Sequence, residues 1–375
     1  MPSLTYASAR EVAPDIHALL AEHLAHAIAR GEDGLASLPA ADTIAAMIDA
    51  AFWASLRREE TYVPRISLAA VRPEEAAHPL RFFQPLPLTP PALARVAPAV
   101  ERPGVHLGVS EQQPLAVWGI ARALPKYACV IEVAEPGLLV VKQHRGSDLV
   151  KYANLAVLQG DHVRIVDEQA SSLPDCPPLL SSLLGFESPG SWVGSMNVLV
   201  QIAVSMRAHG RGGLLLVVPT ETAGWRDSIV QPVLYGVDPP FTELATRKLE
   251  SGDGPASRAE LARTVDAIAG LTAVDGATVL TADHRLLAFG AKVTRRRGAS
   301  PVEQVMLTEP IQGGVAELLN PAQLGGTRHL AAAQFVHDQR DAVALVASQD
   351  GRFTIFAWSA CEAMVHAHRV EALLL

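Results

Sequence analysis

Cysteine is scarce in this chain of 375 residues, which carries only Cys129, Cys176 and Cys361. The three are far apart and none forms a Cys-x-x-Cys pair, so the sequence offers neither a disulfide framework nor a zinc site. A sparse and odd cysteine count is typical of proteins that work in a reducing compartment. We therefore expect a fold without disulfide bonds or a structural zinc ion.

Long apolar runs are also missing. No segment approaches the roughly 18 consecutive apolar residues that indicate a membrane-spanning helix. The first residues, MPSLTYASAREVAPD, lack the basic stretch and apolar run of a secretory signal. We expect a soluble, cytoplasmic protein with no membrane partner.

The sequence has no excess of basic residues. Its 31 Lys and Arg are outnumbered by 39 Asp and Glu, which gives a formal charge of −8. This balance argues against a surface that tracks nucleic acid, and we expect no direct nucleic-acid binding. It does not exclude a local basic pocket for a small anion. Since 49% of the residues are hydrophobic and 19% are charged, there is ample material for buried cores.

The length exceeds one ordinary domain of about 100–200 residues, so two or three globular units are expected. Helical spacing of apolar residues dominates residues 12–56, and prolines break up residues 63–103. Short β-branched strands then alternate with helices, which predicts an α/β fold. The predicted units are residues 1–110 (helical and proline-rich), 111–250 (α/β) and 251–375.

Individual elements follow from periodicity and turn residues. The stretch LAVWGIARAL (115–124) is expected to be a helix in front of several short strands, and RFFQPLPLTPPAL an extended connector or a short edge strand. Residues 168–186, rich in serine and proline, fit a boundary. Residues 360–375 are expected to form a final helix, with His366 and His368 on different faces at the surface.

One candidate site lies at Gly-Gly-Thr-Arg-His (325–329), which opens the predicted helix LAAAQFVHD. Glycines before a helix let backbone N–H groups approach an anion, and the helix dipole favours negative charge there. Thr327 and Arg328 add a hydroxyl and a planar guanidinium suited to phosphate, and His329 adds a donor or metal ligand. A phosphate site and ordinary helix capping both explain these residues.

A second motif, Asp275-Gly276-Ala277, lies where a predicted helix gives way to a strand. The carboxylate is a hard oxygen ligand for Mg²⁺ or Mn²⁺, and the small residues leave room for a ribose or base, although Asp-Gly is also a common turn. We predict that both motifs line one open cleft. The intervening run Arg295–Arg297 either reaches a bound phosphate or forms a solvated loop tip.

Taken together, VDGATVL, GGTRHLAAA and VALVASQDGRFTIF resemble the diadenylate cyclase domain family, which carries DGA and GTRHR motifs and includes the DNA-integrity scanning protein DisA. The resemblance covers roughly Leu261 to Ser359. It implies a C-terminal domain with a mixed sheet wrapped by helices. In active members, two protomers meet face to face and condense two ATP molecules into cyclic di-AMP.

The resemblance assigns roles to individual residues. Those it places at the nucleotide are Asp275, Gly276, Ala277, Gly326, Thr327, Arg328, His329 and Ser348. Asp275 would also bind the metal, and Asp275 and His329 would be catalytic in an active enzyme.

The chain departs from the family pattern at two positions of the second motif. Leu330 stands where the family has a second arginine, and Gly325 stands where active enzymes often have an acidic residue. Losing a guanidinium removes charge stabilisation from a triphosphate site. The N-terminal 250 residues also differ from the DNA-binding tail or membrane anchor of known cyclases. The chain is therefore most similar to the DACNV-type group of predicted prokaryotic sensor proteins.

These observations predict a sensor of ATP or a cyclic dinucleotide that uses a degenerate cyclase-like domain. The cofactors expected are Mg²⁺ or Mn²⁺ with the bound nucleotide and otherwise none, and self-association is expected from the resemblance. Two alternatives stay open: an active diadenylate cyclase, and a structural descendant whose site has collapsed. Enzymatic activity is thus left undecided by the sequence.

Overall fold

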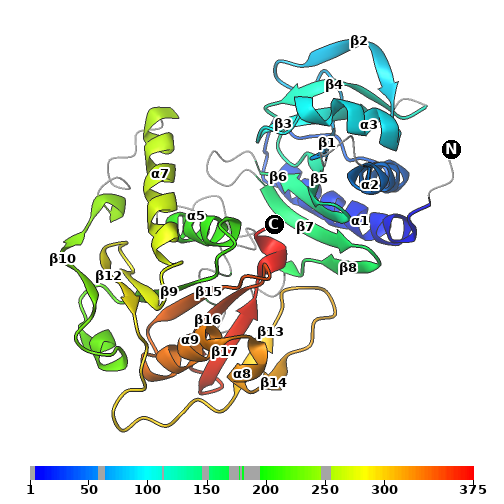
Figure 1. The fold of residues 1–375 in the computed structure, drawn as a ribbon. Helices are drawn as coiled ribbons and strands as arrows, with labels where there is room; N and C mark the ends of the chain where they lie inside the picture. The colour runs from blue at the N-terminus through cyan, green and yellow to red at the C-terminus, as the bar shows by residue number, and fades with distance from the viewer. Residues whose placement is uncertain are drawn as a thin grey trace. The chain divides into compact units, whose positions relative to one another are not determined.

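The computed structural model describes residues 5–57, 64–111, 114–145, 152–168, 177, 180, 195–245 and 255–375. The chain divides into two compact units, Met1–Val166 with Leu375, and Asp167–Leu374. Each unit contains one large mixed β-sheet with helices (Figure 1). The predicted α/β class and the mixed sheet of the C-terminal unit are confirmed. Within the described residues, no helix is long and apolar enough to cross a membrane.

The division between the units differs from the predicted boundaries. The boundary at 110/111 falls between two antiparallel neighbours of one sheet, β3 (Val105–Ser110) and β4 (Ala116–Arg122). Hydrogen bonds between strands, which periodicity does not reveal, join the first 110 residues to the strands that follow. The boundary at 250/251 lies outside the described residues. The stretch at 168–186 begins next to the observed division, although most of it also lies outside the described residues.

The N-terminal unit contains an eight-stranded sheet. In sheet order its strands are β2 (Leu80–Pro87), β4, β3, β1 (Ser67–Ala70), β5 (Cys129–Glu135), β6 (Leu138–His144), β7 (Tyr152–Gln159) and β8 (His162–Ile165). Among these strands only β1 and β3 are parallel neighbours. The helices α1 (Ala7–Ala29) and α2 (Ala41–Ser55) pack against each other and against strands of the sheet, and α3 (Pro90–Val96) packs against α2.

The prediction of a helix at residues 115–124 is wrong, because these residues form β4. Five consecutive β4 residues are buried, so the strand lacks the alternation that would have separated it from a buried helix. The proline-rich segment was predicted to be an extended connector or a short edge strand. It forms an edge strand, β2. An edge is where a sheet tolerates residues without an N–H group, such as Pro85 and Pro87.

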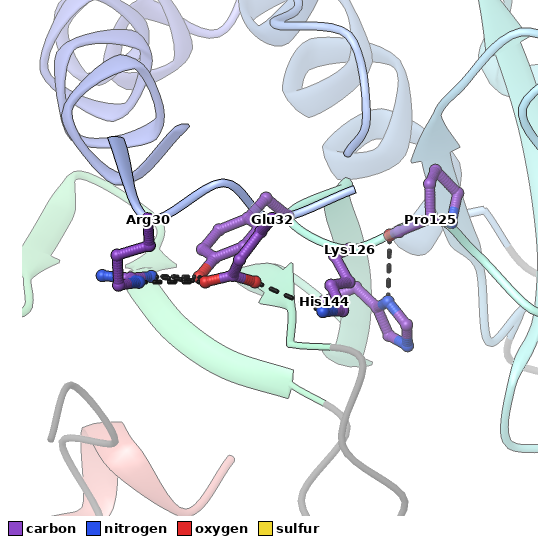
Figure 2. A network of polar contacts seen from close by, with 6 residues as sticks. Arg30, Glu32, Pro125, Lys126 and His144 are labelled. Atoms are coloured by element: carbon purple, nitrogen blue, oxygen red, sulfur yellow. Dashed lines mark hydrogen bonds and ion pairs between the residues drawn. The ribbon is translucent and has the colours of Figure 1, made fainter. Parts of the chain in front are cut away.

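Polar contacts fix the segment after α1 to the connection between β4 and β5 (Figure 2). Glu32 accepts hydrogen bonds from Arg30 at 2.8 Å and from the Nζ atom of Lys126 at 3.3 Å. The carbonyl oxygen of Pro125, on the same connection, lies 3.0 Å from Nδ1 of His144 at the end of β6. Partial burial alone would raise the pKa of Glu32, but the hydrogen bonds from Arg30 and Lys126 lower it. The loop after α1 is thereby held against the sheet.

The C-terminal unit contains a nine-stranded sheet. In sheet order its strands are β10 (Tyr235–Phe241), β12 (Leu286–Ala291), β11 (Ala277–Thr281), β9 (Gly213–Val218), β15 (Val343–Ala347), β16 (Phe353–Ser359), β17 (Met364–Arg369), β13 (Val305–Thr308) and β14 (Glu317–Leu319). Among its described residues the α-helices are α5 (Ser195–Ala208), α7 (Pro255–Leu271), α8 (Pro321–Leu324) and α9 (Thr327–Asp338). The central strands β9 and β11 are parallel, and β15 is antiparallel to β9.

Helix α9 lies against β9, β15, β16 and β17 (Figure 1). Phe335 on α9 and Phe356 on β16 are fully buried in the same apolar cluster. The cluster also takes Leu214, Leu216 and Val218, alternate residues of β9 that share one face of the strand. Helices α5 and α7 pack against each other, and α5 also contacts β15. The packing of α9 on the sheet is what positions the candidate site.

The prediction of a helix at residues 360–375 is wrong, because they form β17 and a short 3-10 helix, Glu371–Leu373. β17 is hydrogen-bonded on both sides, to β16 and to β13. Positions i and i+2 share a face in a strand. His366 and His368 are therefore neighbours, with ring centroids 5.8 Å apart, and His368 is buried instead of exposed.

We expect His368 to make the protein less stable in acid. Burial, reinforced by the neighbouring His366, lowers the pKa of His368 to about 3. Between about pH 6.5, the ordinary value, and pH 3, the unfolded chain binds a proton here that the folded chain does not. The free energy of unfolding should thus fall as the pH falls, by at most about 1.4 kcal/mol per pH unit from this group.

Urea unfolding of wild type and His368→Asn between pH 7 and pH 4 measures this effect. The variant should lose less stability over the acid range than wild type, and His162→Asn, a change at an exposed histidine, should match wild type. Equal acid slopes for wild type and His368→Asn would contradict the prediction.

Candidate functional site

The first motif opens helix α9. The preceding turn, α8, begins with a capping box in which Oδ1 of Asn320 accepts from Ala322 N–H at 2.9 Å and Gln323 returns a bond to Asn320 N–H. Gly326 is the N-cap of α9 and provides no side-chain cap. The first N–H groups of a helix lack intrahelical partners. The start of α9 therefore presents backbone donors that no N-cap side chain satisfies.

Helix geometry separates the side chains of this motif. Thr327 is exposed and Arg328 is half-buried, whereas His329 is only 3% exposed and packs edge-on against Phe356. Burial lowers the pKa of His329, which favours the neutral ring. A side chain at Gly325 would come within 2.6 Å of this ring. The histidine thus faces the sheet, and the glycine before the helix leaves space for it.

The second motif lies just before β11. Gly276 has φ of +113°, and a Cβ there would lie 2.5 Å from the carbonyl carbon of Gly290 on β12. Only glycine fits this close approach of two backbones. Asp275, the residue before it, has a side chain that is 90% exposed and ion-paired with Lys292. An exposed carboxylate thus lies two residues before the first residue of β11.

The two motifs meet at one cavity of about 490 Å³. Asp275 and Gly276 line it from the start of β11, and Thr327 and Arg328 line it from the start of α9. The other lining residues are Leu214, Ala291, Lys292, Val293, Thr294, Arg295, Pro301, Val302, Leu330, Ala331 and Gln334. The volume is typical of small-molecule sites, which range from about 300 to 1,000 Å³.

The lining of this cavity is electropositive. Lys292, Arg295 and Arg328 contribute three cations, and Asp275 is the single carboxylate. The hydrogen bond and charge of Lys292, with a smaller effect of Arg328, lower the pKa of Asp275. The guanidinium of Arg328 lies beside Gly212, where a Cβ would meet Nη1 at 2.9 Å. Such a lining favours an anion with several negative charges.

The remaining predicted residues do not line the cavity. Ala277 and His329 are buried, and Gly326 is exposed at the N-cap of α9. Ser348 follows β15, donates its N–H to the carbonyl oxygen of Arg352 at 2.9 Å, and hydrogen-bonds the Asp350 side chain. Of the arginines at 295–297, Arg295 lines the cavity. Arg296 lines a different cavity at the other end of α9.

Sequence reasoning missed Lys292. The signal for it is the pairing of β11 with β12, in which Ala277 is opposite Ala291. In this antiparallel register Lys292, which follows Ala291, lies across from Gly276, which precedes Ala277. Lys292 therefore comes near Asp275. Antiparallel strands joined by a short connection would have suggested this pairing.

The site fits a divalent metal only in part. Asp275 is one hard oxygen ligand, and the described residues contain no group of three His, Cys, Asp or Glu side chains that could hold an ion. Asp275 is also paired with Lys292. Mg²⁺ is often held by one or two carboxylates together with substrate phosphates. The donor set therefore fits an ion that arrives with a phosphate ligand and does not fit a resident metal centre.

Comparison with known proteins gives one family match. Residues 33–122 match the model of a family described as the probable sensor domain DACNV. This confirms the predicted similarity to DACNV-type sensor proteins. The matched segment lies in the N-terminal unit, whereas the sequence resemblance was based on the C-terminal residues.

Solved structures give a weaker comparison. The chain is similar to a hypothetical membrane spanning protein from Bacillus cereus at 15% identity, over 50% of this chain and 67% of that chain, with a TM-score of 0.27. At that score the similarity carries no argument about the site. No curated protein matches the chain.

The two motif glycines should respond differently to substitution. Gly276→Ala forces a Cβ into the backbone of Gly290 at positive φ, and should lower the free energy of unfolding by at least about 2 kcal/mol. Gly326→Ala places the same methyl group in open space at φ of −76°, and should cost less than about 1 kcal/mol. Thermal and urea unfolding of both variants test the difference, and equal losses would show that β11 and β12 are not so closely packed.

Proposed function

We propose that the chain is a sensor protein whose C-terminal unit binds a nucleotide, either ATP or a cyclic dinucleotide, in the cavity between α9 and β11. The observation that carries the proposal is the meeting of Asp275 and Arg328 at one cavity, together with two further cations. Family matching supports the sensor role, and the chemistry of the cavity supports the class of ligand.

The phosphates would bind at the start of α9. Arg328 offers a planar pair of donors, Thr327 a hydroxyl, and the first turn of α9 its backbone N–H groups. Lys292 and Arg295 add charge from the segment after β12. These groups come from separate elements and converge on one space, which ordinary helix capping does not require.

The apolar part of the lining suits a nucleoside. It consists of Val293, Pro301, Val302 and Ala331, together with Leu214, Ala291 and Leu330. Small-molecule sites combine such apolar walls with a few polar groups that fix orientation.

His329 would act as a positioning residue, because its buried ring sets how α9 sits on the sheet.

A divalent ion would enter with the nucleotide. Asp275 would hold Mg²⁺ or Mn²⁺ together with the phosphates, and the ion would supply charge neutralisation. For this, the carboxylate must exchange Lys292 for the ion. The exposure of both side chains makes that exchange inexpensive.

Leu330 favours binding over synthesis. Its side chain is 44% exposed and lines the same cavity, at the position where the resembled family has arginine. An apolar group there leaves less charge against a transferring phosphoryl group, which enzymes stabilise with cations. Active synthesis remains the second candidate, because Asp275 is accessible and lies close to Arg328.

Replacing Arg328 should weaken nucleotide binding. We expect Arg328→Ala to raise the Kd for ATP in the presence of Mg²⁺ at least about tenfold, because hydrogen bonds to charged groups contribute about 1.5–3 kcal/mol. Arg297→Ala removes the same charge outside the cavity lining and should have little effect. Isothermal titration calorimetry of wild type and both variants measures these Kd values. If wild type binds neither ATP nor cyclic di-AMP at millimolar concentration, the proposal fails.

Replacing Leu330 by arginine, the residue of the resembled family at this position, should convert a nucleotide-binding protein into one with cyclase activity. Wild type incubated with ATP and Mn²⁺ should form no cyclic di-AMP, whereas Leu330→Arg should form detectable amounts. Chromatography of the reaction measures the product, and adding Asp275→Asn to Leu330→Arg should remove it. Cyclic di-AMP from the wild type, lost in Asp275→Asn, would establish the cyclase alternative instead.

A further inference from the structure

The N-terminal unit has a cavity of its own, of about 480 Å³. All its lining residues fall between Ser37 and Trp118, inside the segment that matches the probable sensor domain. The cavity shares no residue with the site at α9. A domain that senses a small molecule needs a pocket, and among the cavities found in the described residues this one lies within the matched segment.

The position of the cavity follows from the sheet topology. The strands β1 and β3 are the parallel neighbours of this sheet, and both end at the cavity. Val71 and Arg72 follow β1, and Ser110 and Glu111 complete and follow β3. In α/β sheets, ligands bind beyond the carboxyl ends of parallel strands, where the connecting loops diverge. The cavity has that position.

Two carboxylates fix the walls of the cavity. Glu75 accepts from the backbone N–H of Arg72 at 2.7 Å and from the backbone N–H and hydroxyl of Ser37, so it joins two loops. Glu111 accepts from the backbone N–H of Ala40 at 2.7 Å, which ties the same loop to the end of β3. The cavity is thus held open by hydrogen bonds within the protein, as expected of a preformed ligand site.

Two aromatic side chains, Trp118 and Phe82, contribute to the lining. The indole N–H of Trp118 donates to the carbonyl oxygen of Val71 at 2.8 Å, and the ring lies over Gly108, where a Cβ would come within 2.2 Å of it. Phe82 lines the cavity from β2, while its neighbour Phe83 is 99% exposed. Alternation along the strand thus places one of two adjacent phenylalanines at the cavity.

The charges of the lining favour a cation. Arg72 is paired with Glu75 at 2.9 Å, and Arg81 is paired with Glu74 at 2.8 Å. Glu111, the third carboxylate, forms no ion pair with a lining arginine, and its charge adds to the hydrogen bond and charge of Glu75 and to the charge of Glu74 in raising the pKa of Arg72. Three carboxylates and two arginines leave the lining with one negative charge in excess. The faces of aromatic rings also attract cations. Both the excess negative charge and the faces of the aromatic rings would disfavour an anionic ligand.

We propose that this cavity is the ligand site of the sensor domain, and that it binds a small organic amine with an aromatic or apolar body. The ammonium group lies at Glu111, and the body lies against Phe82 and Trp118. The inference extends the sensor role and does not depend on nucleotide binding by the C-terminal unit.

The test uses the whole chain of 375 residues and three probes of similar size: phenethylamine, phenethyl alcohol and phenylacetate. At pH 7 these carry a positive charge, no charge and a negative charge. Calorimetry should show binding of phenethylamine, weaker binding of the alcohol and none of phenylacetate. No binding of phenethylamine at millimolar concentration, or equal binding of phenylacetate, overturns the proposal.

Matched variants locate the binding. Phe82→Ala and Glu111→Gln should each weaken phenethylamine binding by about tenfold or more. Phe83→Ala and Glu135→Gln change exposed residues outside the lining and should leave it unchanged. Glutamine keeps an oxygen for the Ala40 N–H, and unchanged melting curves confirm that the fold persists. Equal affinities in all four variants would place the amine elsewhere and overturn the proposal.

The same proteins distinguish this inference from the nucleotide proposal. Glu111→Gln should bind ATP as wild type does, and Arg328→Ala should bind phenethylamine as wild type does. Amine binding that is lost in Arg328→Ala would place the amine at the α9 cavity and overturn the assignment. Loss of ATP binding alone, with amine binding intact, would overturn only the nucleotide proposal.

Discussion

The burial of one face of α9 against the C-terminal sheet controls everything proposed for that unit. Phe335 and His329 lie on the buried face, and consecutive residues of a helix point about 100° apart. Arg328 and Leu330, on either side of His329, lie outside that face, and both line the cavity. The burial of His329 against the sheet thus keeps the imidazole out of the lining, to which a guanidinium and an apolar side chain contribute.

The cavities of the two units differ in how they are built. In the N-terminal unit the cavity lies beyond the carboxyl ends of the parallel pair β1 and β3. In the C-terminal unit it lies at the opposite ends of the parallel pair β9 and β11, where Leu214 and Gly276 line it. Positive charge there comes from a helix start and from Lys292 and Arg295. The first lining has an excess carboxylate and the second has excess cations, so the two cavities suit ligands of opposite charge.

Most elements of the fold could be predicted from the sequence. Helices α1, α2, α5, α7 and α9 and the strands around Gly213, Ala277 and Val343 follow from periodicity and turn residues. The errors at residues 115–124 and 360–375 both fall on strands that are hydrogen-bonded on either side. In β4, five consecutive buried residues remove the alternation that identifies a strand, whereas β17 alternates in part and is fixed by its pairing with β16 and β13. The motif residues Asp275 and Arg328 were identifiable, whereas Lys292 was not, because its role depends on strand register.

The sequence by itself determined the class of the fold, the two motifs and the absence of the second arginine at Leu330, since these depend on local pattern and residue identity. Tertiary structure alone decided where the units divide, which motif side chains share a cavity, and that the matched sensor segment contains a cavity of its own. Strand pairing and the packed face of a helix bring together residues far apart in the chain. Local propensity carries no information about such contacts, because they are fixed only when the core is buried.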